Sequence, residues 1–242
     1  MSSNDTSPTV AIVIQARLGS SRLPGKVTAP LVEGKTVLEY LLDRVSTCRE
    51  AHQVVVATTT NPGDDPLAAW LADRGQPYLR GSETDCLERF RSACVLASAD
   101  VTVRITSDCP LVVPEVVDSM IAYYVRNRNH LDYLSNRQYT DFPEGVDVEI
   151  FSREMLEEAA ACATEQRERE HINYYFLDRP ERFRIRYFNH GSGDDYSRFK
   201  LSIDTLSDLE QIRSFFTSGR LPAEFTLHDL LSLLRRIDKD NP

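Results

Sequence analysis

The first 126 residues alternate between short apolar, β-branched runs and amphipathic segments of helical period, and this alternation limits the possible folds more than any other feature. The expected strands cover residues 9–14, 53–58, 77–79 and 101–105, and the expected helices cover 37–45, a segment opened by Asp65-Pro66 (Asp65 as N-cap), 85–98 and 114–126. Strands without polar alternation are buried on both faces, and strands separated by helices form β-α-β units. The sequence therefore predicts an α/β fold, with a doubly wound, mainly parallel sheet that binds ligands at the carboxyl ends of its strands.

The pattern changes after Leu131, where a polar, turn-rich stretch is followed by shorter elements. The expected elements are a half-exposed strand at 146–150, helices at 153–162 and 167–177, a strand at 199–203, and helices at 206–216 and 227–236. We interpret residues 9–242 as one domain in which residues 131–198 form a small lid or insertion. Residues 1–8 are polar and are expected to form a loose, disordered tail.

Composition excludes several classes of protein. Hydrophobic residues make up 41% and charged residues 27% of the 242-residue chain, as is ordinary for a globular protein. No apolar stretch approaches the roughly 20 residues of a membrane helix, and the net charge of −9 disfavours binding to nucleic acid or to an anionic membrane. The five cysteines are scattered and include no C-x₂-C pair, which argues against a disulfide framework or a structural zinc site. We therefore expect a cytoplasmic protein that binds neither nucleic acid nor membranes.

A cationic loop follows the first expected strand directly. Residues 15–26 contain Arg17, Arg22 and Lys26 and no acidic residue, although the protein as a whole is acidic. Glycines and cations at the end of a buried strand suit a triphosphate, whose oxygens need close backbone approach and positive charge. The loop is not a Walker A motif, because the interval from Gly19 to Gly25 is one residue too long and Val27 stands where Ser or Thr would bind Mg²⁺. The alternative is a surface turn with solvated bases.

Two aspartates lie near strand ends, where the ligand crevice is expected. Asp108 follows the strand at 101–105, and Asp204 follows the expected strand at 199–203. Mg²⁺ typically takes one or two protein carboxylates together with phosphate oxygens. The alternatives are local turn and capping roles. Thr205 with Asp208 can cap the following helix, which leaves Asp204 free to face the cleft.

Candidates for binding the second substrate lie between residues 144 and 171. Glu144, Asp147 and Glu149 surround an expected strand, and Arg169 and His171 lie on an expected helix. Carboxylates there could hold sugar hydroxyls or an amine. A solvated strand face and an exposed charged helix are equally compatible with these residues.

The run IQARLGSSRLPGKV at residues 14–27 resembles the signature of the cytidylyltransferases that make CMP-activated sugar acids, in particular the branch named after a spore-coat polysaccharide synthesis protein. The resemblance continues in family order through ATTTNP (57–62), RGSETD (80–85), RITSDCPL (104–111) and SIDT (202–205). It implies CTP as donor, Mg²⁺ as cofactor held by Asp108 and Asp204, and a possible homodimer. The implied catalytic residues are Arg17, Lys26 and Asp108. The implied nucleotide-binding residues are Ala16, Arg17, Gly19, Ser21, Arg22, Lys26, Thr58, Asp85 and Arg104.

The expected reaction joins CMP from CTP to a sugar, sugar-acid or related phosphorylated or phosphonate acceptor, with release of pyrophosphate. One alternative is a glycosyltransferase that uses nucleotide sugars, but its usual Asp-x-Asp is missing because Asp108 is followed by Cys109 and Pro110. The other alternative is a binding protein of the same fold without turnover. The spacing of the motifs identifies neither the base nor the acceptor.

Overall fold

The computed structural model describes residues 7–240. The tail expected at residues 1–8 therefore lies mostly outside the described residues. Within residues 7–240, no helix is both long enough and apolar enough to cross a membrane.

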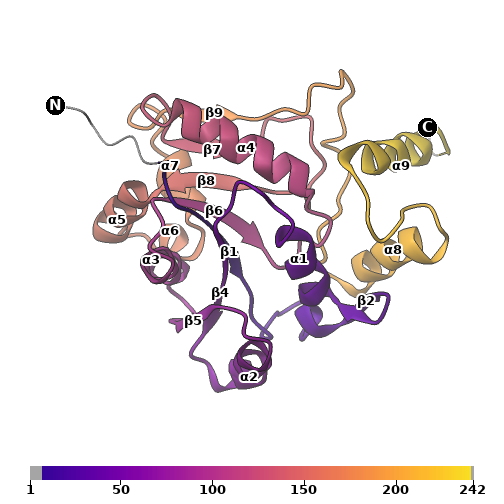
Figure 1. Ribbon diagram of the computed structural model, residues 1–242, viewed down its shortest axis with the longest axis horizontal. Helices are drawn as coiled ribbons and strands as arrows, with labels where there is room; N and C mark the ends of the chain where they lie inside the picture. Colours follow the sequence, from indigo (N-terminus) through magenta and orange to yellow (C-terminus); the bar gives the residue numbers. More distant parts are fainter. Residues whose placement is uncertain (1–6, 241–242) are drawn as a thin grey trace.

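A central sheet of seven strands, in the order β5-β4-β1-β6-β8-β7-β9, organises the molecule (Figure 1). Pairing is parallel throughout except for β8, which runs antiparallel to both of its neighbours. The strands are β1 (Val10–Gln15), β4 (Gln53–Thr59), β5 (Tyr78–Gly81), β6 (Val101–Thr106), β7 (Tyr133–Ser135), β8 (Glu149–Ser152) and β9 (Ile185–Tyr187), with a separate hairpin of β2 (Pro30–Val32) and β3 (Lys35–Thr36). The mainly parallel α/β fold predicted from the sequence is confirmed.

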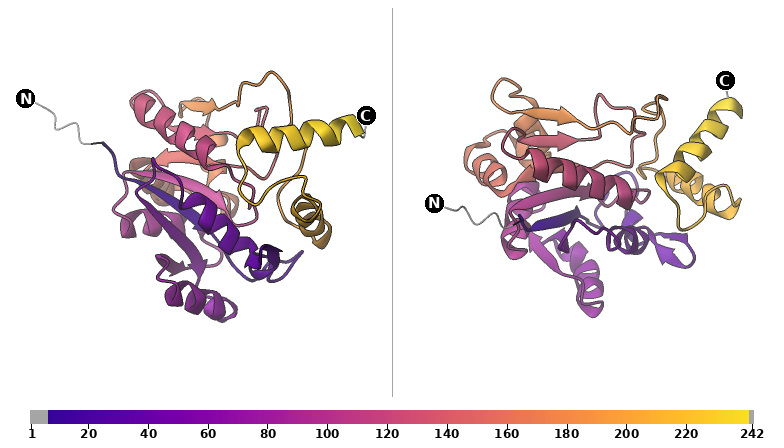
Figure 2. Two further views of the ribbon diagram at one scale, coloured as in Figure 1. Left: turned by 45° about the vertical axis from the view of Figure 1, so that its right-hand side comes forward. Right: turned by 45° about the horizontal axis from the view of Figure 1, so that its top comes forward.

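Helices cover both faces of this sheet, as Figures 1 and 2 show from three directions. They are α1 (Val37–Val45), α2 (Asp65–Asp73), α3 (Cys86–Leu96), α4 (Pro114–Asn127), α5 (Arg153–Cys162), α6 (Gln166–Glu170), α7 (Asn173–Leu177), α8 (Leu206–Thr217) and α9 (Leu227–Asp240), with 3-10 turns η1 (Lys26–Thr28) and η2 (Pro62–Asp64). Alternate residues of β1 enter two separate cores. Ile12 packs in the core that includes α1 and α4, and Val13 packs in the core that includes α3, α5 and α7. Burial on both faces explains why β1 has no polar alternation.

Residues 131–198 continue the sheet beyond β6, because they supply β7, β8 and β9. Two expectations for this region are wrong. The expected half-exposed strand at 146–150 is instead the buried strand β8, which starts at Glu149 and pairs on both edges. The single helix expected at 167–177 is broken at His171 and Ile172 into α6 and α7.

The expected strand at 199–203 is also wrong. This segment forms one isolated bridge, between Lys200 and Glu144, and otherwise has no regular secondary structure. Leu201 and Ile203 are buried, and the N–H of Ile203 donates to the carbonyl of Asp108 at 2.8 Å. The alternation of apolar residues in this segment therefore arises because Leu201 and Ile203 are buried against loops, and not because the segment is a strand.

Helix α2 exists where it was expected, but its start differs. The helix begins at Asp65 and its N-cap residue is Asp64, so the expected capping role of Asp65 is wrong. The Asp64 carboxylate makes no capping hydrogen bond. It accepts one hydrogen bond from the Leu18 N–H at 2.6 Å and a short one from the Thr59 hydroxyl. Asp64 therefore ties the loop after β1 to the end of β4.

Candidate active site

A cleft of about 250 Å³ opens at the carboxyl ends of β1 and β6. It lies where ligands bind in open parallel sheets. Its lining residues are Gln15, Ala16, Arg17, Ser20, Ser21, Arg22, Lys26, Glu83, Cys86, Arg89, Thr106, Ser107, Asp108, Glu170, His171 and Asp204. The structure therefore brings together eight of the residues that the sequence had marked, which are Ala16, Arg17, Ser21, Arg22, Lys26, Asp108, His171 and Asp204.

The cationic loop forms one wall of the cleft. Gly25 has φ of +70°, a left-handed conformation that glycine adopts without strain, and it turns the chain into η1. The helical turn η1 therefore starts at Lys26, a residue that is only 9% exposed. Arg17, in the same loop, pairs with Glu83 at 3.1 Å.

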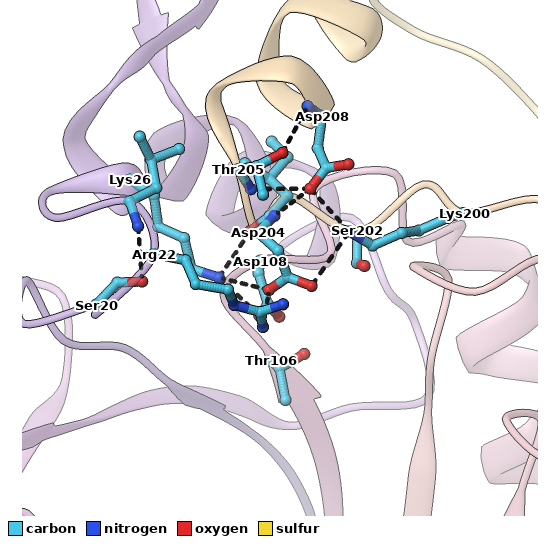
Figure 3. A network of polar contacts seen from close by, with 12 residues as sticks. Ser20, Arg22, Lys26, Thr106, Asp108, Lys200, Ser202, Asp204, Thr205 and Asp208 are labelled. Carbon is cyan, nitrogen blue, oxygen red and sulfur yellow. Dashed lines mark hydrogen bonds and ion pairs between the residues drawn. The ribbon is translucent and has the colours of Figure 1, made fainter.

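Lys26 is the centre of the polar network in Figure 3. Its Nζ lies 2.9 Å from Asp108 Oδ2 and 3.4 Å from Asp204 Oδ1, and it donates to the Ile203 carbonyl at 2.7 Å. Asp108 follows the end of β6, and Asp204 lies immediately before the cap of α8. Two carboxylates that are far apart in sequence thus converge on one ammonium group.

Asp204 faces this network because its neighbours cap the helix. Thr205 and Asp208 form a reciprocal capping box at the start of α8, which confirms the capping pair predicted from the sequence. The Asp204 carboxylate pairs with Arg22 Nη2 at 2.8 Å and with Lys200 Nζ at 3.2 Å. Its side chain is 14% exposed, so it remains accessible from the cleft.

The protein environment shifts the pKa of two titratable groups that line the cleft. Burial of the Asp108 carboxyl raises its pKa, but the charge of Lys26 and hydrogen bonds from Thr106 and Lys26 outweigh burial, so the net pKa lies below the ordinary value. Asp108 is therefore ionised near neutral pH. Burial lowers the pKa of His171, which also lines the cleft, and this favours its neutral imidazole.

The donor set around Lys26 fits a hard divalent cation. Carboxylate oxygens are the ligands that Mg²⁺ prefers, and Asp108 and Asp204 already approach one positive centre from two sides. Residues 7–240 contain no group of three or more His, Cys, Asp or Glu side chains that could hold a metal ion. Further ligands would have to be water or substrate oxygens, as is usual for Mg²⁺ in phosphate-binding sites.

Arg104 and Glu149, expected to bind nucleotide and acceptor respectively, pair with each other. Arg104 Nη1 makes a short ion pair with Glu149 Oε2, and the other Glu149 oxygen accepts a hydrogen bond from the Tyr133 hydroxyl. All three side chains are buried. Burial, together with the Glu149 charge, raises the pKa of Tyr133 well above its usual value. The group lies beneath the cleft and does not line it.

The remaining marked residues also lie outside the cleft lining. Asp85 caps α3 by accepting from the Glu88 N–H, and its other oxygen accepts two hydrogen bonds from Arg169, at 2.8 and 2.7 Å. Thr58 is fully buried, and Gly19 lies beside Glu83.

Two of the three carboxylates expected to bind the acceptor have protein partners outside the cleft. Glu144 accepts from the Ser202 hydroxyl at 2.6 Å. Asp147 lies 3.5 Å from the Arg137 Nε. Neither residue belongs to the cleft lining.

Sequence reasoning missed several residues of the cleft. The main ones are Gln15, Glu83, Cys86, Arg89, Ser107 and Glu170. Gln15, Glu83 and Ser107 fall inside the motifs that carry the family resemblance, so motif membership was an available signal for them. Cys86 and Arg89 follow the motif at 80–85 closely, on the first turns of α3, and no motif contains them.

Comparisons with known proteins agree with the fold and the cleft. The family model for cytidylyltransferases matches residues 11–228, and the chain belongs to this family. It is 29% identical to the spore coat polysaccharide biosynthesis protein SpsF of Bacillus subtilis over 94% of both chains. It is 33% identical to a 3-deoxy-manno-octulosonate cytidylyltransferase of Anaeromyxobacter dehalogenans over 46% of both chains. A solved cytidylyltransferase from Leptospira borgpetersenii superposes with a TM-score of 0.87, at 33% identity and covering 96% of both chains. The family resemblance predicted from the motifs is confirmed.

Proposed function

We propose that this cytidylyltransferase transfers CMP from CTP to a sugar-acid acceptor and releases pyrophosphate. The observation that supports the proposal most strongly is the convergence of Asp108 and Asp204 on Lys26, inside a cleft that Arg17 also lines. Anionic phosphates and a divalent cation both need such a set of fixed opposite charges. The relative from Anaeromyxobacter dehalogenans, named for a sugar acid, supports this class of acceptor.

In the proposed reaction an acceptor oxygen attacks the α-phosphorus of CTP. A new P–O bond forms as the bond to the pyrophosphate oxygen breaks, and that oxygen keeps the bonding electrons. Transfers of this kind depend mainly on positioning and charge neutralisation, without a covalent enzyme intermediate. Arg17, Lys26 and Arg22 would bind the phosphates and stabilise the charge that grows on the leaving pyrophosphate.

Asp108 and Asp204 would hold Mg²⁺. When bound there, Mg²⁺ supplies positive charge to the phosphate oxygens and to the acceptor oxygen. Lys26 now lies between the two carboxylates, so binding of the cation requires the ammonium group to move toward the phosphates. Its bond to the Ile203 carbonyl, at 2.7 Å, is the contact that such a shift would stretch.

Pyrophosphate release tests the proposal. Wild-type protein is mixed with each of CTP, UTP, ATP and GTP and with a panel of acceptors that includes 3-deoxy-manno-octulosonate, its 8-amino-3,8-dideoxy analogue, a sugar phosphate and a phosphonate. We expect release with CTP and a sugar acid in the presence of Mg²⁺. Release with UTP, ATP or GTP but not with CTP would contradict the proposed donor. Release only with a phosphorylated acceptor would contradict the proposed acceptor. The Asp204→Asn variant is the matched inactive control.

A further inference from the structure

Arg89 differs from every cation of the loop wall because it has no carboxylate partner. Arg17, Arg22 and Lys26 each form an ion pair within the protein. Arg89 is only 5% exposed, yet it forms no ion pair with any residue in the described range 7–240. A buried guanidinium without a counter-charge costs free energy, and proteins retain such groups where they serve a ligand.

The guanidinium of Arg89 keeps hydrogen-bond donors in reserve. Its Nη1 donates to the carbonyls of Ser82 and Glu83, which fixes the side chain against the loop before α3. Its Nε is buried and has no hydrogen-bond partner, and its Nη2 donates to no acceptor among the described residues. The side chain lines the cleft. A fixed, charged fork with unused donors is the usual device for binding a carboxylate or a phosphate.

Space for this arginine is provided by Gly81 at the end of β5. A Cβ atom at position 81 would lie 2.7 Å from Arg89 Cγ and 3.4 Å from its Cδ. Only glycine leaves room for the aliphatic part of Arg89 in this position. The Arg89 side chain is thus held by hydrogen bonds to the carbonyls of Ser82 and Glu83 and by close packing against Gly81.

Gln15 adds a second set of unused donors to the same cleft. Its Oε1 accepts from Arg104 Nε at 3.3 Å and Nη2 at 3.1 Å, and from Cys86 Sγ at 3.4 Å. Arginine can only donate, so the oxygen of the Gln15 amide must face it and the NH₂ group must face away. The Gln15 Nε2 donates to no acceptor in the described part of the chain. Arg104 and Glu149, which lie below the cleft, therefore fix the orientation of a cleft donor.

We propose that Arg89 and Gln15 form an oxyanion subsite on the α3 wall of the cleft, separate from the cationic loop, which binds a carboxylate or phosphate group of a substrate. Cys86 connects the two residues, since it contacts the Gln15 amide and lies one helical turn before Arg89. The proposal rests on the proposed function, which offers two sources for the anion: the carboxylate of a sugar-acid acceptor and the phosphates of CTP.

The test compares wild-type protein with Arg89→Gln, Arg89→Lys and Gln15→Glu. The Gln15→Glu variant keeps an oxygen for Arg104 but replaces the cleft donor by a negative charge. Arg91→Gln is the matched control, because Arg91 lies on the same helix, pairs with Glu88 and does not line the cleft. Dissociation constants for CTP and for inorganic pyrophosphate are measured by calorimetry, the KM for 3-deoxy-manno-octulosonate by pyrophosphate release, and folding by thermal melts.

We expect Arg89→Gln and Gln15→Glu to weaken one of these constants about 10- to 100-fold, and Arg89→Lys to weaken it less, while Arg91→Gln leaves it unchanged. A loss in CTP and pyrophosphate binding assigns the anion to the phosphates. A loss in acceptor KM alone assigns it to the carboxylate. Folded Arg89→Gln and Gln15→Glu variants with all three constants within twofold of wild type would overturn the subsite. If the wild-type protein binds no CTP, that result counts against the proposed function and not against the subsite. The subsite is then tested by comparing the affinities of the variants for pyrophosphate.

Discussion

The ammonium group of Lys26 lies 2.9 Å from the carboxylate of Asp108, although the two residues are 82 positions apart in the sequence. Lys26 comes from the turn after β1 and Asp108 from the turn after β6, and these two strands are neighbours in the sheet. Parallel neighbours end at the same edge, so the pair follows directly from the topology. Asp204 joins the pair from a third segment, which enters beside Asp108 through the bond from the Ile203 N–H.

Replacement of either aspartate should stop turnover. We expect Asp108→Asn and Asp204→Asn to lower kcat by at least about 10²-fold, because each removes a charge from the proposed cation site. Thermal melts should show a folded protein in both cases. Asp229→Asn is the matched control, since Asp229 exchanges hydrogen bonds with Thr226 at the start of α9 and does not line the cleft. Near-normal pyrophosphate release from Asp108→Asn or Asp204→Asn would remove that residue from the proposed site.

Removal of Lys26 should affect stability as well as binding. In Lys26→Met the two carboxylates lose their shared counter-charge, and the side chains are 28% and 14% exposed, so we expect a loss of about 2–3 kcal/mol in metal-free buffer. Mg²⁺ should then raise the melting temperature of Lys26→Met more than that of wild type, because it restores the missing charge. Equal shifts in the two proteins, measured across a Mg²⁺ titration, would argue against a cation between these carboxylates.

The strongest expectations from sequence were those in which local pattern and topology agree. Buried runs such as residues 10–15 gave the parallel sheet, and the cationic loop lies in the cleft because it follows one of these strands. Predictions of secondary structure were wrong where a segment is buried against loops and not paired with a neighbouring strand. Leu201 and Ile203 alternate as in a strand but pack against loops, and this choice depends on the tertiary neighbours.

Roles of single charged residues were harder to predict. Arg104 lies on β6 close to the expected crevice, and nothing local indicates that Glu149 occupies the facing position on an antiparallel strand. The two residues face each other because of the register in which β6 pairs with β8. Arg89 was missed for the converse reason, because a helical arginine is ordinarily solvated and only the three-dimensional structure shows its burial.

The Arg104–Glu149 pair should behave as a structural unit. Arg104→Met leaves a buried carboxylate without a counter-charge, and we expect a loss of about 3–5 kcal/mol in the free energy of unfolding. The double variant Arg104→Met/Glu149→Leu should recover most of this loss, because the second change removes the stranded charge. Denaturant titrations of both variants and of Glu149→Leu give the coupling. Additive effects would show that the two groups act independently.

Asp147 should make stability fall as pH rises. Burial raises its pKa to about 6, with Arg137 opposing this effect and Glu149 adding to it, whereas an unfolded Asp titrates near 3.8. Between these values the folded state binds more protons than the unfolded state, so ionisation costs stability as pH increases through this window. The shift corresponds to a cost of about 2–3 kcal/mol, complete above pH 6 and absent below about pH 4.

The variant Asp147→Asn isolates this effect from that of the other acidic groups. We expect it to be more stable than wild type at pH 7.5 and to lose that advantage as the pH falls toward 4. Denaturant midpoints of both proteins, measured at several pH values across this range, provide the comparison. A constant difference between the two proteins at every pH would contradict the raised pKa.

Gly145 connects the backbone of one loop to the placement of Asp204. Its φ is +101°, and a Cβ at this position would lie 2.4 Å from the backbone carbon of Leu201 and from the nitrogen of Ser202. Gly145→Ala therefore forces the segment 201–203 to move, and with it the carboxylate of Asp204. We expect a loss of about 3 kcal/mol or more in stability, together with weaker turnover in the protein that remains folded.

The control variant Gly219→Ala tests the backbone strain of a positive φ without displacing a neighbouring segment. Gly219 has a φ of +68°, but a Cβ atom added there would meet no other atom within 4 Å. That control should lose only about 1 kcal/mol and keep full activity. Equal losses of stability and activity in the two variants, by denaturant titration and pyrophosphate release, would show that close packing at Gly145 does not position Asp204.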